Sequence, residues 1–452
     1  MRGRTNITQR SGTVPVNGDV KEFVVANGNN INIGDFVSIF YEGESDNLLD
    51  IYGDNVYPEY EYVGELNGKK IIYVSNVKNI NNSKIIVFDE NGGIVLITTI
   101  GINLYGKRGI KTACLVGQYL VVCGYSSYSS SYPSTFYLYR FSSDCKILES
   151  LGSYSFNDVG IGVCSICEVG VDVFISVYYR NSSIKGISLF KIENEEIKFV
   201  QGGSSVFNSL GNLSVIAIPN KNKNGAYIIL RDTYDNSLVC GNIIVQDYQI
   251  SYNDISKLSL SSIDYFGSWF FVNDNTFFIF SDNTKSTSGK RSFMVFEIID
   301  EKIVFKMISE IPSISYNGYS LNPRYSFLLE NNNIVFIYSR FNDANKIYYL
   351  FLYSYDNGVM VYEDELGELL NEDSNVFTSM FVLKSNSFLL FYNYVEETST
   401  SIFKMEFNII DNFIIKSGGS FVTEYNGKSI GFAKTGGSSG DIIQVYVPKE
   451  IS

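Results

Sequence analysis

The sequence predicts an all-β fold: a seven-bladed β-propeller inserted in a small β-barrel that the two ends of the chain form. A unit of about fifty residues recurs seven times between Tyr60 and Lys416, and each copy reads as two β-hairpins joined by a longer polar loop. Four antiparallel strands at this period are typical of a propeller blade. The first hairpins open near Tyr60, Ile110, Gly162, Asn212, Gly267, Arg324 and Phe377.

Within each copy, short runs of β-branched and aromatic residues predict the strands, as in residues 172–177 and 333–338. The turns between them, such as Asn67-Gly68 and Asn224-Gly225, place residues that tolerate positive φ where a hairpin needs them. Helical periodicity is nearly absent, and residues 366–370 are compatible with one helical turn at most. The repeat therefore assigns residues 60–420 to the propeller.

The two chain ends, residues 1–59 and 421–452, are predicted to form the barrel together. Both are rich in strand-forming residues, and both ends of a propeller leave it on the same face. In this register blades 1 and 7 are each complete, so we expect them to meet by side-chain packing alone. The barrel would then act as the clasp of the ring, pairing residues 36–39 or their neighbours with residues 443–447.

Composition excludes several function classes. The 452 residues are 45% hydrophobic and 15% aromatic, which supplies a large core. A formal net charge of −13 argues against a nucleic-acid partner, because phosphate binding needs a basic surface. No apolar run reaches about 18 residues, and the start lacks the apolar core of a signal peptide, so we expect no membrane insertion. We expect the protein to be made and kept in a cytoplasm, or to leave the cell by lysis or within a particle.

The absence of histidine removes the usual general base near neutral pH, histidine-ligated metals, and Ser-His or Cys-His catalysis. The six cysteines are expected to be buried as small apolar residues. Cys164 and Cys167 have the spacing of half a zinc site, but residues three apart on a strand point to opposite faces. We therefore expect no metal, no cofactor and no catalytic residue. A glycosidase that uses carboxylates alone remains the enzymatic alternative.

Aromatic residues beside Ser and Asn are expected in the connections on one face of the ring. Large rings beside adaptable polar groups are typical of contact surfaces; the alternative is that the rings only fill the central channel. The candidate ligand-binding residues of this kind are Tyr154, Phe156, Phe207, Tyr265, Phe266, Tyr316 and Tyr319.

Three arginines form a sharper pattern. Arg180, Arg231 and Arg340 each follow the second strand of a blade. Equivalent positions in a ring converge, so three guanidinium groups could face one anionic ligand, such as a phosphate, an acidic sugar or a partner's carboxylates. The alternative is that they are surface arginines paired with neighbouring aspartates such as Asp232 and Asp343.

A Gly-Asp-Phe-Val strand at residues 34–37 and the segment from Ile430 to Pro448 resemble the small β-barrel structural proteins of tailed-phage virions, head decoration proteins among them. The resemblance covers about 60 residues at the two ends, and the chain departs from it by the long insertion. It implies that the barrel attaches to a particle, in many copies on a symmetric assembly. The implied attachment residues are Gly34, Asp35, Phe36, Val37, Ile443, Val445, Tyr446 and Val447.

These observations predict a non-enzymatic virion structural protein of a bacteriophage or a phage-tail-like particle. The barrel would bind tail, baseplate or capsid proteins, and the propeller would act as a tail, baseplate or fibre-associated adhesin for a bacterial surface glycan or protein. The closest alternative is a capsid decoration protein with a propeller appendage. A carbohydrate-active propeller enzyme is the alternative from another class.

Overall fold

The computed structural model of the protein contains two compact units, residues Asp46–Ile414 and the two chain ends, Met1–Ser45 with Ile415–Ser452. The residues it describes are 18–25, 29–40, 46–52, 58–76, 83–90, 92–100, 112–124, 135–155, 161–180, 184–203, 215–220, 222–232, 237–259, 265–273, 275–282, 291–310, 314–316, 319–329, 333–340, 347–356, 359–371, 375–384, 387–395, 399–410, 413–416, 421–424, 430–438 and 441–448.

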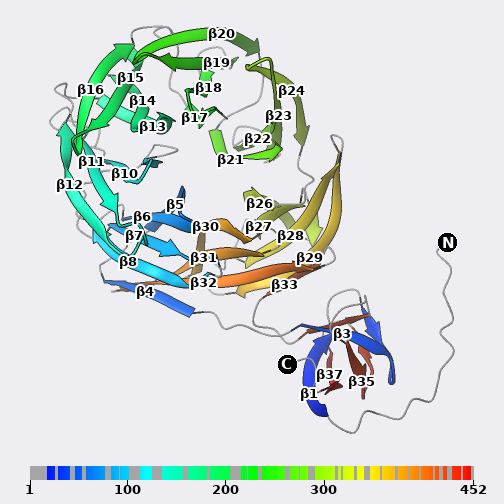
Figure 1. Ribbon diagram of the computed structural model, residues 1–452. Coiled ribbons are helices and arrows are strands. Elements are labelled where there is room, and N and C mark those ends of the chain that lie inside the picture. The colour runs from blue at the N-terminus through cyan, green and yellow to red at the C-terminus, as the bar shows by residue number, and fades with distance from the viewer. Residues whose placement is uncertain are drawn as a thin grey trace. The chain divides into compact units, whose positions relative to one another are not determined.

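The described strands of the larger unit form seven antiparallel sheets, and neighbouring strands follow chain order in all of them except at β4 (Asp46–Tyr52), which joins the last sheet (Figure 1). We number these sheets as blades 1 to 7. Blade 1 contains β5 (Pro58–Leu66), β6 (Lys69–Asn76), β7 (Ser83–Phe88) and β8 (Ile94–Ile100). Blade 2 contains β9 (Ala113–Val116), β10 (Tyr119–Gly124), β11 (Thr135–Phe141) and β12 (Leu148–Ser155). Blade 3 contains β13 (Ile161–Gly170), β14 (Val173–Arg180), β15 (Ile184–Glu193) and β16 (Glu196–Gly203).

Blades 4 and 5 contain β17 (Val215–Pro219), β18 (Gly225–Asp232), β19 (Ser237–Gln246) and β20 (Gln249–Ser259), then β21 (Tyr265–Asn273), β22 (Thr276–Asp282), β23 (Arg291–Ile299) and β24 (Lys302–Glu310). Blade 6 contains β25 (Ile314–Tyr316), β26 (Tyr319–Leu328), β27 (Asn333–Arg340), β28 (Ile347–Asp356) and β29 (Val359–Asn371). Blade 7 contains β30 (Asn375–Lys384), β31 (Ser387–Val395), β32 (Ser399–Ile410) and β33 (Phe413–Lys416). Residues 366–370 lie within β29, so the possible helical turn predicted there is a strand.

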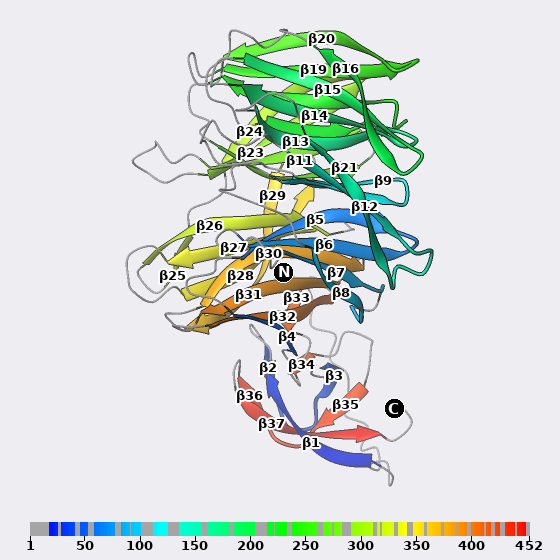
Figure 2. The ribbon, with the colours of Figure 1, turned by 90° about the vertical axis from the view of Figure 1, so that its left-hand side faces the viewer.

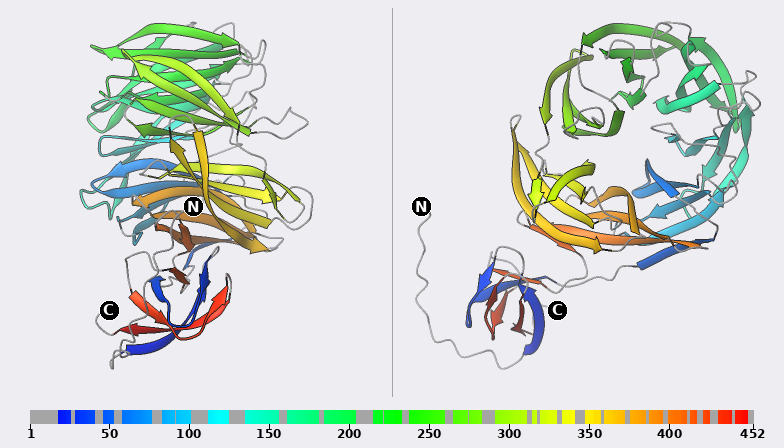
Figure 3. Two further views of the ribbon diagram at one scale, coloured as in Figure 1. Left: turned by 90° about the vertical axis from the view of Figure 1, so that its right-hand side faces the viewer. Right: turned by 180° about the vertical axis from the view of Figure 1, so that it is seen from behind.

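The inner strands of the blades surround the centre of the ring, as the view from behind shows (Figure 3), and most of them contact the inner strand of the next blade. Such contacts join β5 to β9, β9 to β13 and β13 to β17, and β21 to β26, β26 to β30 and β30 back to β5. The prediction of an all-β propeller is confirmed. The predicted turn at Asn67 and Gly68 is also present, with φ of 51° and 71°.

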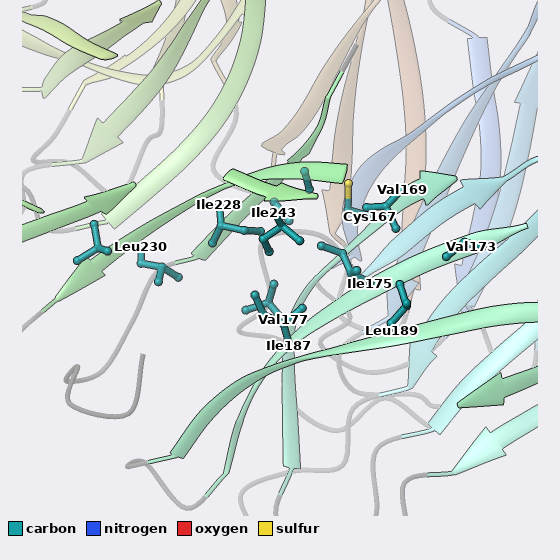
Figure 4. Packing of buried hydrophobic residues seen from close by; sticks show 13 residues of the cluster. Cys167, Val169, Val173, Ile175, Val177, Ile187, Leu189, Ile228, Leu230 and Ile243 are labelled. Carbon is teal, nitrogen blue, oxygen red and sulfur yellow. The ribbon is translucent and has the colours of Figure 1, made fainter. Parts of the chain in front are cut away.

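Each blade is held to its neighbours by apolar side chains on both faces, because successive strand residues point to opposite sides. On β14, Val173, Ile175 and Val177 pack toward blade 4 (Figure 4). Phe174, between them in sequence, packs toward blade 2. Strands buried on both faces explain why the repeats read as nearly continuous apolar runs.

The ring closes differently from the prediction. Strand β4 (Asp46–Tyr52) pairs antiparallel with β32, from Tyr52 opposite Ser399 to Asp46 opposite Lys404. Blade 7 is therefore completed by a strand that precedes blade 1, and the expectation of side-chain packing alone is wrong. The assignment of residues 46–52 to the barrel is wrong for the same reason. β32 has 12 residues and β33 has 4, so a long edge of β32 needs another partner for its backbone groups.

The smaller unit is a closed barrel with the strand order β1 (Gly18–Val25), β34 (Phe421–Glu424), β3 (Phe36–Phe40), β35 (Ile430–Ala433) and β37 (Ile442–Pro448) (Figure 2). A short pair, β2 (Asn30–Ile31) and β36 (Gly437–Ser438), accompanies it. β1 pairs with β37 over seven residues. The predicted pairing of residues 36–39 with 443–447 does not form, because β35 lies between β3 and β37.

Candidate functional site

The alternation of side chains along the barrel strands divides the predicted attachment residues into two groups. Val37, Ile443 and Val445 are fully buried and form the barrel core with Phe23 and Val25. A buried side chain has no surface left for a partner, so these three stabilise the barrel core and are not available for a contact. Val447 lies opposite Asp19 in the β1–β37 ladder, and its side chain lies outside the described residues.

Gly34 and Asp35 form the turn that leads into β3. Gly34 adopts a φ of 88°, which glycine reaches without strain, and its N–H donates to the Ala433 carbonyl at 2.8 Å. The Asp35 carboxylate accepts hydrogen bonds from the Asn32 backbone N–H at 2.8 Å and from its side-chain amide at 3.1 Å. The Gly34 N–H thus joins the two halves of the barrel, and so does the Asp35 backbone carbonyl, which accepts a hydrogen bond from the Ala433 N–H at 2.9 Å. The Asp35 carboxylate stabilises its own turn.

Phe36 and Tyr446 belong to the outward-facing group. The strand register places Phe36 opposite Phe432, Phe432 opposite Tyr446, and Tyr446 opposite Val20. The Phe36 and Phe432 rings lie 4.4 Å apart between centroids, and Phe36 and Val20 are 45% and 43% exposed. These four residues form one continuous row across β3, β35, β37 and β1, which we call the aromatic row.

Among the described side chains of the barrel, the aromatic row is an exposed apolar surface of the kind that protein interfaces contain. Aromatic residues are enriched at the cores of protein interfaces, and a contiguous exposed apolar patch marks an interaction site. Ile442, which is 69% exposed, lies on the same face of β37 four residues before Tyr446, with Gln444 between them. Phe432 and Val20 were missing from the prediction, because only the strand register reveals that they lie beside Phe36 and Tyr446.

The three predicted arginines occupy the same end of the second strand in their blades. Arg180 is the last residue of β14 and pairs with Ile161 at the beginning of β13. Arg340 is the last residue of β27 and pairs with Leu321 near the beginning of β26. Arg231 is the last residue but one of β18. Their equivalent backbone positions agree with the prediction, but their side chains lie outside the described residues. Convergence on one anion therefore stays a prediction.

The predicted aromatic contact residues are placed mostly in strands, not loops. Tyr265 and Phe266 begin β21, and Tyr316 pairs with Tyr319 across the β25–β26 hairpin. Tyr154 lies in β12, where its half-buried ring packs edge-on against Phe190 of blade 3 at 5.6 Å, and burial raises the pKa of its hydroxyl. Tyr154 is thus a packing residue between two blades. Phe156 and Phe207 lie outside the described residues.

Two acidic side chains join blades together. The Glu61 carboxylate accepts hydrogen bonds from the Thr112 N–H at 2.9 and 3.0 Å, from the Thr112 hydroxyl at 2.8 Å and from the Ala113 N–H at 2.9 Å. Glu168 accepts one from the Gly117 N–H at 3.0 Å and pairs with Lys223 at 2.8 Å. These carboxylates link blade 1 to blade 2, and blade 3 to blades 2 and 4.

The cysteines with described side chains, Cys114, Cys123, Cys145, Cys167 and Cys240, are all buried. Burial raises the pKa of Cys240 to about 12, which makes it an unreactive thiol. Across the described ranges, no group of three or more Cys, Asp or Glu side chains is placed to hold a metal ion. The same ranges contain no helix of the length and apolarity that crossing a membrane requires.

No family model matches the chain, and no curated protein matches it in sequence. Among solved structures, it is similar to the periplasmic gluconolactonase of Pseudomonas aeruginosa, an enzyme, with 10% identity, a TM-score of 0.47, and coverage of 86% of this chain and 99% of the other. It is also similar to the WD40 domain of SCAP from fission yeast, with 10% identity, a TM-score of 0.46, and coverage of 92% and 99%. At these identities the similarity concerns the propeller fold alone.

Proposed function

We propose that the protein is a non-enzymatic structural component of a phage or phage-tail-like particle. The terminal barrel attaches to other virion proteins, and the propeller is presented as a tail, baseplate or fibre-associated adhesin for the host surface. The observation that carries the proposal is the aromatic row on a barrel that both chain ends build. Such a barrel is a separate attachment module, into which the propeller is inserted as one continuous segment.

The aromatic row has the chemistry that an attachment surface needs. Complete burial of a large apolar side chain contributes about 1.5–3 kcal/mol, so the exposed half of Phe36 alone retains about 1 kcal/mol for a partner. A stable interface buries about 1,000 Å² or more, which needs the whole row and its surroundings. Many copies on a symmetric particle would strengthen weak contacts between each propeller and the host surface.

Gold-labelled antibodies against the protein, applied to purified particles and viewed by negative-stain electron microscopy, test the location. Label on tails, baseplates or fibres is expected. Label on heads alone would favour the role of a capsid decoration protein over that of an adhesin. The proposed attachment role of the barrel would be unaffected. The virion assignment would be refuted if the cells make the protein but neither microscopy nor mass spectrometry detects it in the purified particles.

The non-enzymatic part of the proposal needs its own test. A glycosidase that uses carboxylates needs two of them about 5–10 Å apart beside the scissile bond. Glu61 and Glu168, the acidic residues of lowest exposure described above, are already engaged between blades. Incubation of the protein with host cell-wall polysaccharide should release no new reducing ends. Release above the level of a heat-denatured sample would favour the enzyme.

A further inference from the structure

A groove of about 390 Å³ lies between blades 1 and 2, lined by β8 on one side and by β11 and β12 on the other. Figure 1 shows β8 and β12 toward the outer margin of the ring. The volume falls within the range of about 300–1,000 Å³ that small-molecule sites occupy. Six of its lining residues carry a hydroxyl group: Thr98, Thr99, Tyr137, Tyr139, Ser150 and Ser153.

The groove lies where blade 2 lacks an aromatic residue that four other blades carry: Phe199, Tyr252, Phe305 and Tyr362. In blade 3, Phe190 on the third strand pairs with Phe199 on the fourth, and their rings lie 5.7 Å apart. Blade 5 has the same arrangement in Phe296 and Phe305, 5.6 Å apart. Each of these pairs lies opposite the second residue of the second strand. Phe190, Phe296 and Phe305 pack in the gap to the preceding blade, whereas Phe199 is 48% exposed beside Phe190.

The corresponding pair of blade 2 is Tyr139 and Ser150. Blade 4 has Ile243 and Tyr252 there, and Tyr252 packs against the core between blades 3 and 4. Ser150 is exposed and much smaller than Tyr252 or Phe305, so the space that those two rings fill beside the preceding blade is open between blades 1 and 2. A side chain at the neighbouring Gly152 would also meet no atom within 4 Å.

The hydroxyl groups of this groove offer both donors and acceptors. Thr98 faces the groove from β8, as Ile100 does, whereas the Thr99 hydroxyl, which accepts a hydrogen bond from Lys84 at 2.6 Å, lies on the other face of the strand. Tyr139 is only 6% exposed although it lines the groove. Burial, reinforced by the nearby Tyr137, raises the pKa of Tyr139 to about 12, so its hydroxyl stays protonated. Tyr137 is half-buried and adds aromatic surface, and Leu148 adds apolar surface.

We propose that this groove binds a saccharide unit. A sugar presents hydroxyl groups around its ring edge and C–H groups on its faces, which matches hydroxyl side chains beside the Tyr137 ring and Leu148. The inference rests on the proposed function for its biological meaning, because it identifies the host-surface ligand as a glycan. It does not use the three arginines or the barrel.

The test uses the full chain and three probes: the methyl glycosides of glucose, N-acetylglucosamine and galacturonic acid. Saturation-transfer difference NMR detects binding, and titration gives the dissociation constant, which is expected to be near 1 mM for a single sugar. The main variant is Ser150→Phe, which adds the residue that blades 3 and 5 carry. A second is Thr98→Tyr, which fills the groove from blade 1 with the ring that blade 2 carries at Tyr154.

Both filling variants should weaken binding at least tenfold. Ser150→Ala, which keeps the groove open, should stay within about threefold of the wild type. Ser143→Phe, at an exposed serine in the turn between β11 and β12, controls for an added ring elsewhere. Thermal melting confirms folding, and either filling variant is sufficient if the other does not fold.

No signal with any probe overturns the inference, and so does unchanged binding by a folded filling variant. If the wild type binds and the filled variants do not, but the protein is absent from particles, the saccharide groove stands and the virion assignment fails.

Discussion

Proline substitutions in β4 should reveal the backbone ladder that closes the ring. Leu49, Asp50 and Ile51 pair with Ile402, Ser401 and Thr400 of β32. In an antiparallel ladder, alternate residues direct their N–H groups toward the partner strand. Proline has no N–H, so it disrupts pairing at those residues and is tolerated where the N–H points away from the sheet. The effects at positions 49 and 51 should therefore resemble each other and differ from the effect at position 50.

The magnitude follows from the backbone groups that a disruptive proline leaves unpaired. Loss of one ladder hydrogen bond removes about 0.5–1.5 kcal/mol, and its carbonyl partner on β32, once unsatisfied, adds about 1–3 kcal/mol. The free energy of unfolding should fall by about 2–4 kcal/mol. The larger unit has about 370 residues, and its unfolding entropy at about 2.1 cal/mol/K per residue is about 0.8 kcal/mol/K. The melting temperature should fall by about 3–5 °C.

Thermal denaturation followed by circular dichroism measures this effect, and limited proteolysis detects cleavage near residues 46–52. Alanine at each of the three positions is the matched control, because it removes the side chain and keeps the N–H. Three prolines that all melt like the wild type would show that β4 does not close the ring. Equal destabilisation at all three positions would show that the contribution comes from something other than the ladder.

Three further predictions concern other parts of the chain. Glu61→Gln should lower the free energy of unfolding by about 1–3 kcal/mol in urea denaturation, because the amide brings its own N–H donors to a site where Thr112 and Ala113 already donate. Glu65→Gln, at a carboxylate that is 51% exposed beside Lys70, is the control and should have little effect. Equal losses of stability in the two variants would contradict the role assigned to Glu61. Stability should fall as the pH rises from about 9 to about 12, because burial raises the pKa of Cys240 from 9.0 and of Tyr139 from 10.0 to about 12, so the unfolded chain loses these protons first; a melting temperature that stays constant over this range would contradict it. Phe36→Ser combined with Tyr446→Ser should reduce the amount of protein in purified particles at least tenfold, as measured by immunoblot. Ile299→Ser, at a propeller residue of similar exposure (44%), should leave that amount unchanged. Equal incorporation of both variants would show that the aromatic row is not the attachment surface.

The sequence predicts the blades well because their signals are local. Alternating side chains such as Val173, Phe174 and Ile175 indicate a strand buried on both faces, and Asn67-Gly68 indicates a hairpin. The partner of β4 was missed because it lies about 350 residues away and depends on the unequal lengths of β32 and β33. The aromatic row was half predicted, because pairing across strands decides which residues neighbour Phe36.

The placement of Tyr154 shows another limit of sequence reasoning. Its position between two repeats suggested a loop, but β12 extends through it to Ser155, and its ring packs against Phe190. Ser150 is different, because a comparison of the repeats with one another contains the necessary signal. Once the third and fourth strands are aligned, a serine occupies the position of Phe199, Tyr252 and Phe305.

The two ends of the propeller segment are each held twice, once in the propeller and once in the barrel. On the N-terminal side, β3 of the barrel ends at Phe40 and β4 of blade 7 begins at Asp46; on the C-terminal side, β33 ends at Lys416 and β34 begins at Phe421. Because these connections are so short, either closure keeps the strands of the other at high effective concentration and lowers the entropy lost when they pair. Loss of the β4 ladder should therefore leave the chain ends together, and loss of the barrel should leave the ring closed. We expect that removal of both is required to open the propeller fully, so the barrel is not the only structure that keeps the ring closed.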